Sequence, residues 1–427
     1  MFVKKTIEDI DLEGKTVLLR ADYNVPLDGQ KIADDYRIKQ SLETINYLIE
    51  KNVKLIICSH LGRPDGKKNL AFSLFPVAKR LKELLNRDVE FVPDCIGEEV
   101  TRAVSKMTAG QILLLENLRF YPQEEKNDEQ FAAELAKPAE IFVQDGFGVV
   151  HRAHASTEAI THYLPSVAGF LLRREVDTIT NVMNQPAKPL MAVIGGAKIA
   201  DKIDLIHKFI EIADQVVLGG AMANTFLMSK GVEVGLSLYD KNELSIARDI
   251  IRKAETESKN RQFSLVLPYD VIVSKKIDSS LPIRVVDLMA HSLSEIESYP
   301  KRPTKSAGRV SHDELILDIG PFTGAFIAGN IQAISTVIWN GTMGVTETKS
   351  LLTGIGPYAH GTNILVRSIA GEFGHRPFSL VGGGDTVSYL TENNLVEMFN
   401  HVSTGGGASL ELMAGRKLPG VEALEDR

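Results

Sequence analysis

Cysteine is scarce in this sequence, and long apolar runs and an excess of basic residues are absent. Its 427 residues include two cysteines, Cys58 and Cys95, too few for a disulfide framework or a thiolate zinc site, which suits a reducing compartment. No apolar stretch approaches the ~18 residues of a membrane span, and the first residues contain no signal-peptide core. The formal net charge of −7 argues against a nucleic-acid binder. We therefore expect a cytoplasmic protein with no membrane or nucleic-acid partner.

Length and hydrophobic patterning predict an α/β protein with two domains. A chain of 427 residues is too long for one ordinary core and suits two domains of about 200 residues each. Short runs rich in Val, Ile and Leu, such as 16–19 and 190–194, alternate with stretches of helical spacing such as Tyr36–Glu50. This alternation is typical of parallel sheets covered by helices. We predict two doubly wound, Rossmann-like parallel-sheet domains joined by a helix hinge.

The predicted junction between the domains is a helix at 166–183. Apolar residues recur there at helical spacing, and the segment ends before Asn184-Gln185-Pro186-Ala187-Lys188-Pro189, a linker rich in helix breakers. An ordinary surface helix followed by a loop fits the pattern equally well. With a junction here, residues 1–175 form the N-terminal domain, residues 176–403 the C-terminal domain and residues 404–427 a tail.

The first half contains several basic residues that follow predicted strands or occupy loop-like positions. Its five such arginines are Arg20, Arg37, Arg63, Arg119 and Arg152. Asp22 and Asn24 follow the strand at 16–19 and could hydrogen-bond a substrate hydroxyl, although Asp and Asn also form ordinary turns. His60 follows a later strand. Because arginines on one rim would repel one another unless an anion lay between them, the first half predicts a site for a small polyanion.

The second half contains glycine-rich loops beside lysines. Lys198 and Lys202 follow Gly195-Gly196 and are spaced to share one helix face. Solvated lysines are the plain alternative, but lysines at a helix start oppose the macrodipole, and a bound anion would resolve that conflict. Gly382–Thr386 combines a glycine loop with two capping side chains. A plain capped helix fits, and the triple glycine favours a phosphate cradle.

These motifs resemble those of the phosphoglycerate kinase family. The similar segments run nearly end to end: Arg20–Leu27, Ser59–Pro64, Leu115–Phe120, Asp145–Ser156, Gly195–Ile203, Leu218–Phe226, Asp318–Thr323, Trp339–Glu347, Gly382–Thr386, Ser403–Glu411 and Leu418–Val421. Few other proteins carry even three of them in order. The sequence has neither a Walker A motif nor the protein-kinase motifs, which argues against those two phosphoryl-transfer folds.

The resemblance implies an activity and a role for each site residue. The activity would be reversible, magnesium-dependent phosphoryl transfer between 1,3-bisphosphoglycerate and ADP, giving 3-phosphoglycerate and ATP in glycolysis or gluconeogenesis. The residues implied to hold the acid are Asp22, Asn24, Arg37, His60, Arg63, Arg119 and Arg152. Those implied to bind the nucleotide are Lys202, Gly219, Gly220, Asn340, Glu347, Gly383, Gly384, Asp385 and Thr386. Asp385 would hold the magnesium, and Arg37, Lys198 and Lys202 would be catalytic.

The resemblance also implies how the parts act together. The family is usually monomeric, and transfer is in line after the two domains close around the ligands. The tail from about residue 403 is implied to pack on the N-terminal domain. The acid's carboxylate is already ionised at neutral pH, so its attack needs no general base.

The sequence departs from the family's usual pattern at five positions: Gly146, Val149, Ala221, Thr342 and Thr346. None removes a charged site residue, but the two threonines leave nucleotide selectivity open. Two other functions stay open as well. One is a different acid kinase on the same scaffold, since fold alone does not determine substrate, and the other is a non-catalytic nucleotide-responsive protein. The polar segment Ala290–Ser311 is expected to form a surface excursion.

Overall fold

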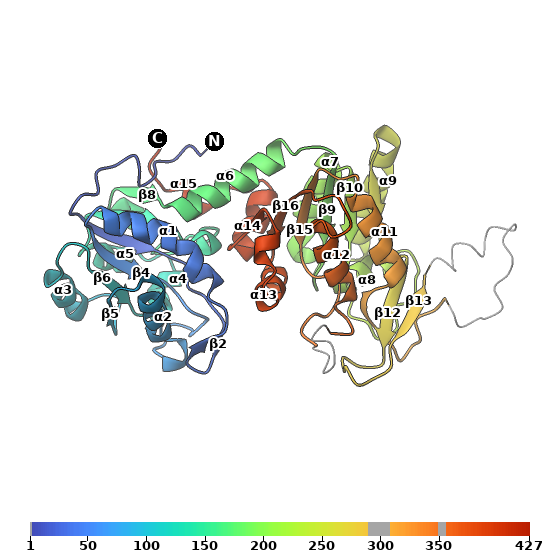
Figure 1. Cartoon of the computed structure of the whole chain (residues 1–427), viewed down its shortest axis with the longest axis horizontal. Coiled ribbons are helices and arrows are strands. Elements are labelled where there is room, and N and C mark those ends of the chain that lie inside the picture. Colours follow the sequence, from blue (N-terminus) through green and yellow to red (C-terminus); the bar gives the residue numbers. More distant parts are fainter. Residues whose placement is uncertain (1, 289–307, 349–355) are drawn as a thin grey trace, which may run out of the picture. The chain divides into compact units, whose positions relative to one another are not determined.

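The structure is a computed structural model that describes residues 2–288, 308–348 and 356–427. It divides into two compact units, Met1–Asn184 with Thr404–Arg427, and Gln185–Ser403 (Figure 1). The predicted boundary after residue 175 falls inside helix α6 (Phe170–Asn184), and the division lies at the end of that helix. Most of the predicted excursion at Ala290–Ser311 lies outside the described residues.

The first unit is built on a parallel sheet with the strand order β5-β6-β4-β1-β7-β8. The strands are β1 (Thr16–Arg20), β4 (Lys54–Cys58), β5 (Val89–Val92), β6 (Ile112–Leu115), β7 (Ile141–Gln144) and β8 (Ser166–Ala168). Ser166–Ala168 was predicted as the start of a helix, but these residues pair with β7 and extend the sheet. A short hairpin joins β2 (Leu27–Asp28) to β3 (Lys31–Ile32).

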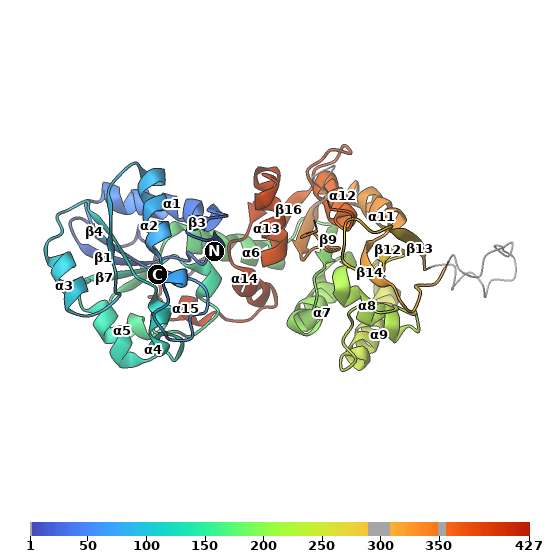
Figure 2. The same ribbon diagram turned by 90° about the horizontal axis from the view of Figure 1, so that it is seen from below.

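Helices cover both faces of this sheet (Figure 2). Successive strand residues point to opposite faces, so Leu19 packs with α1 and α2 while Leu18 packs with α3 and α5. The helices are α1 (Tyr36–Glu50), α2 (Phe75–Leu85), α3 (Glu98–Ser105), α4 (Pro122–Glu125) and α5 (Glu129–Ala136). The C-terminal helices α14 (Gly406–Met413) and α15 (Pro419–Glu422) belong to this unit. Lys4 pairs with Asp426, which brings the two ends of the chain together.

The second unit contains another parallel sheet, with the order β11-β10-β9-β15-β16-β17. Its strands are β9 (Leu190–Ile194), β10 (Gln215–Leu218), β11 (Ser264–Val266), β15 (Thr336–Asn340), β16 (Phe378–Gly382) and β17 (His401–Val402). An antiparallel sheet that the sequence did not predict is formed by β12 (Asp270–Ser274), β13 (Arg284–Asp287) and β14 (Leu315–Ile319). The doubly wound α/β class is confirmed for both units.

Helices lie on both sides of the parallel sheet in this unit as well (Figure 2). They are α7 (Ile203–Ile212), α8 (Gly220–Ser229), α9 (Leu244–Asn260), α11 (Pro321–Ile331), α12 (His360–Ile369) and α13 (Gly384–Glu392). The strand residues Met191–Ile194 and Val337–Trp339 are almost fully buried between these layers. Among the described helices, none combines the length and apolar character needed to cross a membrane.

Candidate functional sites in the two units

The residues predicted to bind the acid all lie near the carboxyl-terminal edge of the first sheet. Asp22 and Asn24 follow β1, and His60 follows β4. Four arginines accompany them: Arg37 in the first turn of α1, Arg63 after β4, Arg119 in a 3₁₀ turn after β6, and Arg152 after β7. In open parallel sheets this edge is where ligands bind. The topology therefore brings the seven predicted side chains to one edge.

Internal contacts orient part of this group. Arg37 Nη1 donates to Asp22 Oδ2 at 3.0 Å and to the Asn24 carbonyl at 3.3 Å. Asn24 Oδ1 accepts from the Gly62 N–H at 2.9 Å, and Arg119 Nη1 donates to the Gly62 carbonyl at 2.8 Å. The Gly62 peptide thus connects the loop after β1 to the buried Arg119 side chain. These contacts preorganise the edge before any ligand binds.

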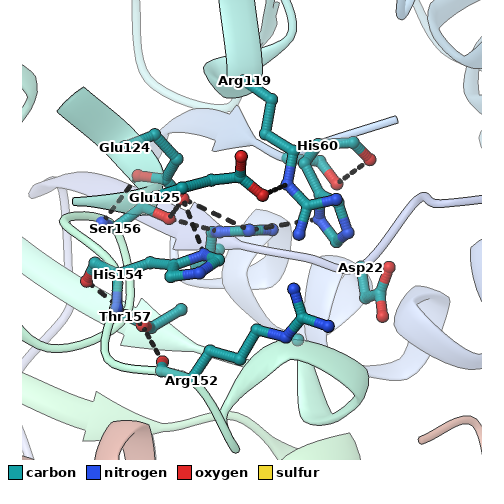
Figure 3. A network of polar contacts seen from close by, with 12 residues as sticks. Asp22, His60, Arg119, Glu124, Glu125, Arg152, His154, Ser156 and Thr157 are labelled. Carbon is teal, nitrogen blue, oxygen red and sulfur yellow. Dashed lines mark hydrogen bonds and ion pairs between the residues drawn. The ribbon is translucent and has the colours of Figure 1, made fainter. Parts of the chain in front are cut away.

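Arg63 and Arg152 remain exposed at the same edge. Arg152 Nε donates to His151 Nε2 at 3.2 Å. In Figure 3 the guanidinium groups of Arg119 and Arg152 both point towards the space beside Asp22 and His60. Burial has the largest effect in lowering the pKa of Arg119, and repulsion from Arg20 and then from Arg152 lowers it further, although Glu125 opposes the shift. An anion placed there would relieve that repulsion.

A buried polar network that the sequence patterns did not predict underlies the arginine cluster. Arg20 was grouped with loop arginines, but it is the last residue of β1 and its side chain is fully buried. It contacts Ser156 at 2.7 Å and His60 at 3.2 Å, and it lies 3.8 Å from Glu124, which is also fully buried. No local pattern identifies Glu124, because its partners lie far away in the sequence. Figure 3 shows this network beside His154.

The histidines of this region are held neutral. Burial, followed by the positive charges of Arg20, Arg119 and Arg37, lowers the pKa of His60 well below its usual value. Burial and the nearby arginines lower the pKa of His154 to about 3. Imidazoles in such a positive field donate or accept hydrogen bonds but carry no charge at neutral pH. The arginines supply the positive charge of the site.

The second unit contains a pocket of about 140 Å³ at the carboxyl-terminal edge of its parallel sheet. Of the predicted nucleotide residues, Gly220, Glu347 and Asp385 line it. It is also lined by several residues to which the sequence assigned no role, among them Asn224, Pro268, Asp318, Met343 and Gly344. Asp318 is buried, and burial raises the pKa of its carboxyl well above the ordinary value. These residues come from segments far apart in the sequence, so only the packing of the unit identifies them.

Beside the pocket, Gly219 packs against a side chain, and Gly220 packs so closely against backbone that glycine is required there. Gly219 precedes α8, and a Cβ there would lie 2.4 Å from the sulfur of Met343. Gly220 has a φ of +64°, and a Cβ there would lie 2.5 Å from the Gly196 nitrogen. Any larger residue would push the two loops apart. Gly220, predicted to line the adenine slot, therefore lets the backbone after β10 approach the backbone at Gly196 and Thr342.

The two predicted catalytic lysines do not share a helix face, contrary to the sequence prediction. Lys202 ends a 3₁₀ turn (Ala200–Lys202), α7 begins at Ile203, and Lys198 precedes both and is exposed. Gly196 adopts a φ of +98°, so the chain leaves β9 through a turn before any helix starts. Lys202 Nζ donates to the Gly195 carbonyl at 2.6 Å and to the Asn340 carbonyl at 3.1 Å. Burial lowers its pKa to about 8.

Asn340 and the loop after β16 complete this edge. Within the described part of the chain, neither the nitrogen nor the oxygen of the Asn340 amide has a hydrogen-bond partner, although both atoms are buried. Thr386 Oγ1 accepts from the Gly341 N–H at 2.8 Å and so ties the start of α13 to β15. Gly383 has a φ of +93°, and Gly384 and Asp385 are exposed beside it. An unpartnered buried amide is costly, which suits a site that a ligand completes.

Asp385 does not belong to a ready-made metal site. Over residues 2–288, 308–348 and 356–427 there is no cluster of three or more His, Cys, Asp or Glu side chains that could hold a metal ion. Magnesium is usually bound through one or two carboxylates together with substrate phosphates and water. A single exposed carboxylate beside a phosphate loop fits magnesium carried by a nucleotide.

The fold and the two sites define a two-domain α/β phosphotransferase. The family model for phosphoglycerate kinase matches residues 7–416. The chain is 45% identical to the phosphoglycerate kinase of Chloroflexus aggregans over 99% of both sequences. It is 41% identical to that of Moorella thermoacetica over 99% of this chain and 100% of the relative.

Solved structures agree with the sequence matches. Phosphoglycerate kinase from Coxiella burnetii is similar with a TM-score of 0.78 and 35% identity, covering 98% of each chain. The enzyme from Pyrococcus horikoshii OT3 is similar with a TM-score of 0.80 and 29% identity, covering 99% of this chain and 98% of the other. This chain therefore belongs to the phosphoglycerate kinase family, and it is a kinase. The family resemblance drawn from the sequence motifs is confirmed.

Proposed function

We propose that this chain transfers a phosphoryl group reversibly between 1,3-bisphosphoglycerate and ADP, producing 3-phosphoglycerate and ATP in glycolysis. Membership of the family over residues 7–416 supports this activity. The roles proposed for individual residues rest on where these residues lie in the fold. Every charged residue assigned to a ligand follows the carboxyl-terminal end of a parallel strand or opens the next helix.

The first unit is proposed to bind the acid. Arginine binds phosphate and carboxylate through two parallel hydrogen bonds, and this edge presents Arg63 and Arg152 to solvent. Asp22 and Asn24 are proposed to accept from or donate to the substrate hydroxyl. Asp22 also accepts from Arg37 at 3.0 Å. The same carboxylate would therefore position both the substrate hydroxyl and the guanidinium that is proposed to be catalytic.

The second unit is proposed to bind the nucleotide. The ammonium of Lys202 is held by two carbonyls beside the glycine-rich loops, and the Asn340 amide lacks a protein partner in the described residues. Phosphate oxygens would accept from both groups. Glu347, at the pocket wall, is proposed to accept from the ribose hydroxyls, and Gly219 and Gly220 to line the adenine slot.

The loop Gly383–Thr386 is proposed to cradle the phosphates. Gly384 opens α13, and backbone N–H groups at a helix start favour a bound anion. Asp385 would hold the magnesium of the nucleotide, whose charge would offset that of the phosphates. Lys198, which is exposed beside the pocket loop, would contact the transferring group.

Phosphoryl transfer in this chain requires positioning and charge neutralisation more than covalent chemistry. The acid's carboxylate is ionised at neutral pH, so no base has to remove a proton. The neutral state of His60 and His154 fits a role in hydrogen bonding. Since different units bind the two ligands, transfer requires the units to close around them, and closure also excludes water from the acyl phosphate.

We further propose that the protein acts as a cytoplasmic monomer without membrane or nucleic-acid partners. The two cysteines are buried and free, and the net charge of −7 disfavours nucleic acid.

The test is a coupled assay with 3-phosphoglycerate, ATP and magnesium, and Lys202→Met serves as the matched loss-of-function variant. Turnover by the native chain and its loss in the variant would support the assignment. A different acid kinase is the competing function, so other short hydroxy acids bearing a phosphate are assayed in parallel. Turnover with one of these and none with 3-phosphoglycerate would replace the proposed substrate.

A further inference from the structure

Arg20 differs from the other arginines of the first unit because every part of its guanidinium is used internally. Its Nε donates to Ser156 Oγ at 2.7 Å, its Nη1 donates to the Ala21 carbonyl, and its Nη2 lies 3.2 Å from His60 Nδ1. The side chain is fully buried, so it does not touch a ligand. Any influence on the acid site must pass through a neighbour, and His60 is the neighbour assigned to the ligand.

The contact between Arg20 and His60 determines which ring nitrogen of His60 carries the proton. A guanidinium has donors only, so Nδ1 of His60 must accept the hydrogen bond and is therefore unprotonated. A neutral imidazole carries one ring proton, which in His60 is then on Nε2. A proton on Nδ1 would place two donors against each other at 3.2 Å.

The surroundings of His60 oppose the charged form of the ring as well. The groups that face it are Arg20 from β1, Arg37 from α1, Arg119 from the turn after β6, and the neutral His154. Burial has the largest effect on the pKa of His60, and the three guanidiniums lower it further. No carboxylate is among these groups, so nothing in this set favours protonation of the ring.

Ser156 and Glu124 hold Arg20 in place. Glu124 Oε1 accepts from Ser156 Oγ at 2.6 Å, and its Oε2 accepts from the Ser156 N–H at 3.0 Å. Because the single hydroxyl proton of Ser156 is donated to Glu124, the hydroxyl oxygen is free to accept from Arg20 Nε. Figure 3 shows the carboxyl group of Glu124 beside Ser156 and His154. The result is a directed chain of hydrogen bonds from Arg20 through Ser156 to Glu124.

We propose that Arg20 is a positioning residue that, held by Ser156 and Glu124, keeps His60 in its neutral Nε2–H tautomer. His60 then offers the acid a hydrogen-bond donor. A bare nitrogen lone pair in the same place would repel an anionic oxygen. The inference rests on the proposed function, because that function assigns His60 to the acid site.

The tautomer can be read directly by long-range ¹H–¹⁵N spectroscopy on the full chain with labelled histidine. The sequence contains ten histidines, and His60→Gln assigns the signal. We expect a protonated Nε2 and an unprotonated Nδ1 throughout, from about pH 5.5 to about pH 8. A proton on Nδ1, or titration of the ring near 6.5, would overturn the inference. This measurement is made on the free protein, so it is independent of turnover.

Ser156→Ala tests whether the buried chain controls the tautomer. The Nε of Arg20 loses its acceptor, so its hold on His60 should weaken and the other tautomer should appear, and the KM for 3-phosphoglycerate should rise by about two- to tenfold while the KM for ATP stays constant. Ser166→Ala is the matched control, since Ser166 is also buried and, within the described residues, its hydroxyl bonds only the Leu164 carbonyl at 2.6 Å. It should lower stability and leave the tautomer unchanged. An unchanged tautomer in Ser156→Ala would contradict the proposal that Ser156 holds Arg20 in its role.

Two substitutions of His60 itself distinguish the roles of its two ring nitrogens. The amide nitrogen of Gln can occupy the place of Nε2, and that of Asn the place of Nδ1. His60→Gln should therefore keep more affinity for 3-phosphoglycerate than His60→Asn. The reverse order would contradict the inference. Absence of all turnover with 3-phosphoglycerate in the native chain would instead refute the proposed function and leave the spectroscopic result to be judged separately.

Discussion

Nucleotide binding by this enzyme should weaken as the pH rises through the pKa of Lys202. Burial lowers that pKa from 10.5 to about 8, an effect only partly offset by Asp385 and Asp201. In the proposed assignment phosphate oxygens bind the charged ammonium, so Lys202 of the free protein would have to be protonated for the nucleotide to bind well. The perturbation is pH, and Lys202→Met is the variant in which this dependence is removed.

The size of the effect follows from the charged fraction of Lys202. With a pKa of about 8, that fraction falls from about three quarters at pH 7.5 to about one tenth at pH 9. The Kd for ADP should therefore rise about eightfold over this interval. The pH dependence of folding stability has the opposite sign to that of nucleotide binding. Between about 8 and 10.5 the unfolded chain binds more protons at this group, so the folded state gains stability as pH rises, by at most about 3 kcal/mol.

Calorimetric titration with ADP and magnesium in buffers of different ionisation enthalpy measures both the Kd and the protons taken up. We expect uptake of about half a proton near pH 8, and almost none near pH 6. Lys202→Met should bind ADP weakly at every pH and take up no proton at this site. An equally steep pH dependence in the variant would refute the reasoning, because the titrating group would then be another one.

Three further predictions use other parts of the structure. Arg37→Ala should lower kcat by about two orders of magnitude or more, with little change in the KM for ATP in steady-state kinetics, and a near-native kcat would exclude a transition-state role. Gly220→Ala should cost about 2 kcal/mol or more in chemical denaturation, because a Cβ there would meet the Gly196 backbone. The control Gly329→Ala, in the last turn of α11 with no neighbouring atom within 4 Å of the added Cβ, should stabilise the protein by up to about 0.5–1 kcal/mol. Burial raises the pKa of Asp145 to about 7, so the folded state loses stability as the pH rises from 3.8 to that value. Asp145→Asn should therefore raise Tm by a few degrees at pH 8 and by less at pH 5, and equal changes at both would contradict this assignment of charge.

The sites differ in how much of them could be predicted. Motif and position predicted that Lys202 and Arg119 follow strands whose ends lie at the ligand edge of a parallel sheet, and the structure has both residues after such strands. The same sequence patterns did not predict the geometry within each site. Lys198 and Lys202 have helical spacing, yet the chain leaves β9 through a turn at Gly196, with a φ of +98°, and Lys198 lies before the 3₁₀ turn Ala200–Lys202 that leads into α7. A local pattern does not reveal a left-handed residue that redirects the chain.

Buried charge was the least predictable feature. In the sequence Arg20 has the same kind of position as the arginines assigned to a ligand. Its partners Glu124 and Ser156 lie more than a hundred residues further along the chain. Whether such a side chain binds a ligand or a buried carboxylate depends on what packs above it. The same holds for Asn340, whose amide is buried without a partner in the described residues.

The sequence alone determined the α/β class, the two parallel sheets and the strand ends at which charged residues gather. Those features follow from hydrophobic periodicity and from the geometry of parallel strands, which act over a few residues at a time. The packed structure was needed to show that Arg20 is buried, that all of α6 belongs to the first unit, and that Met343 and Asp318 line the pocket of the second unit. These depend on contacts between distant segments, whose free energy arises only when the packed core brings them together.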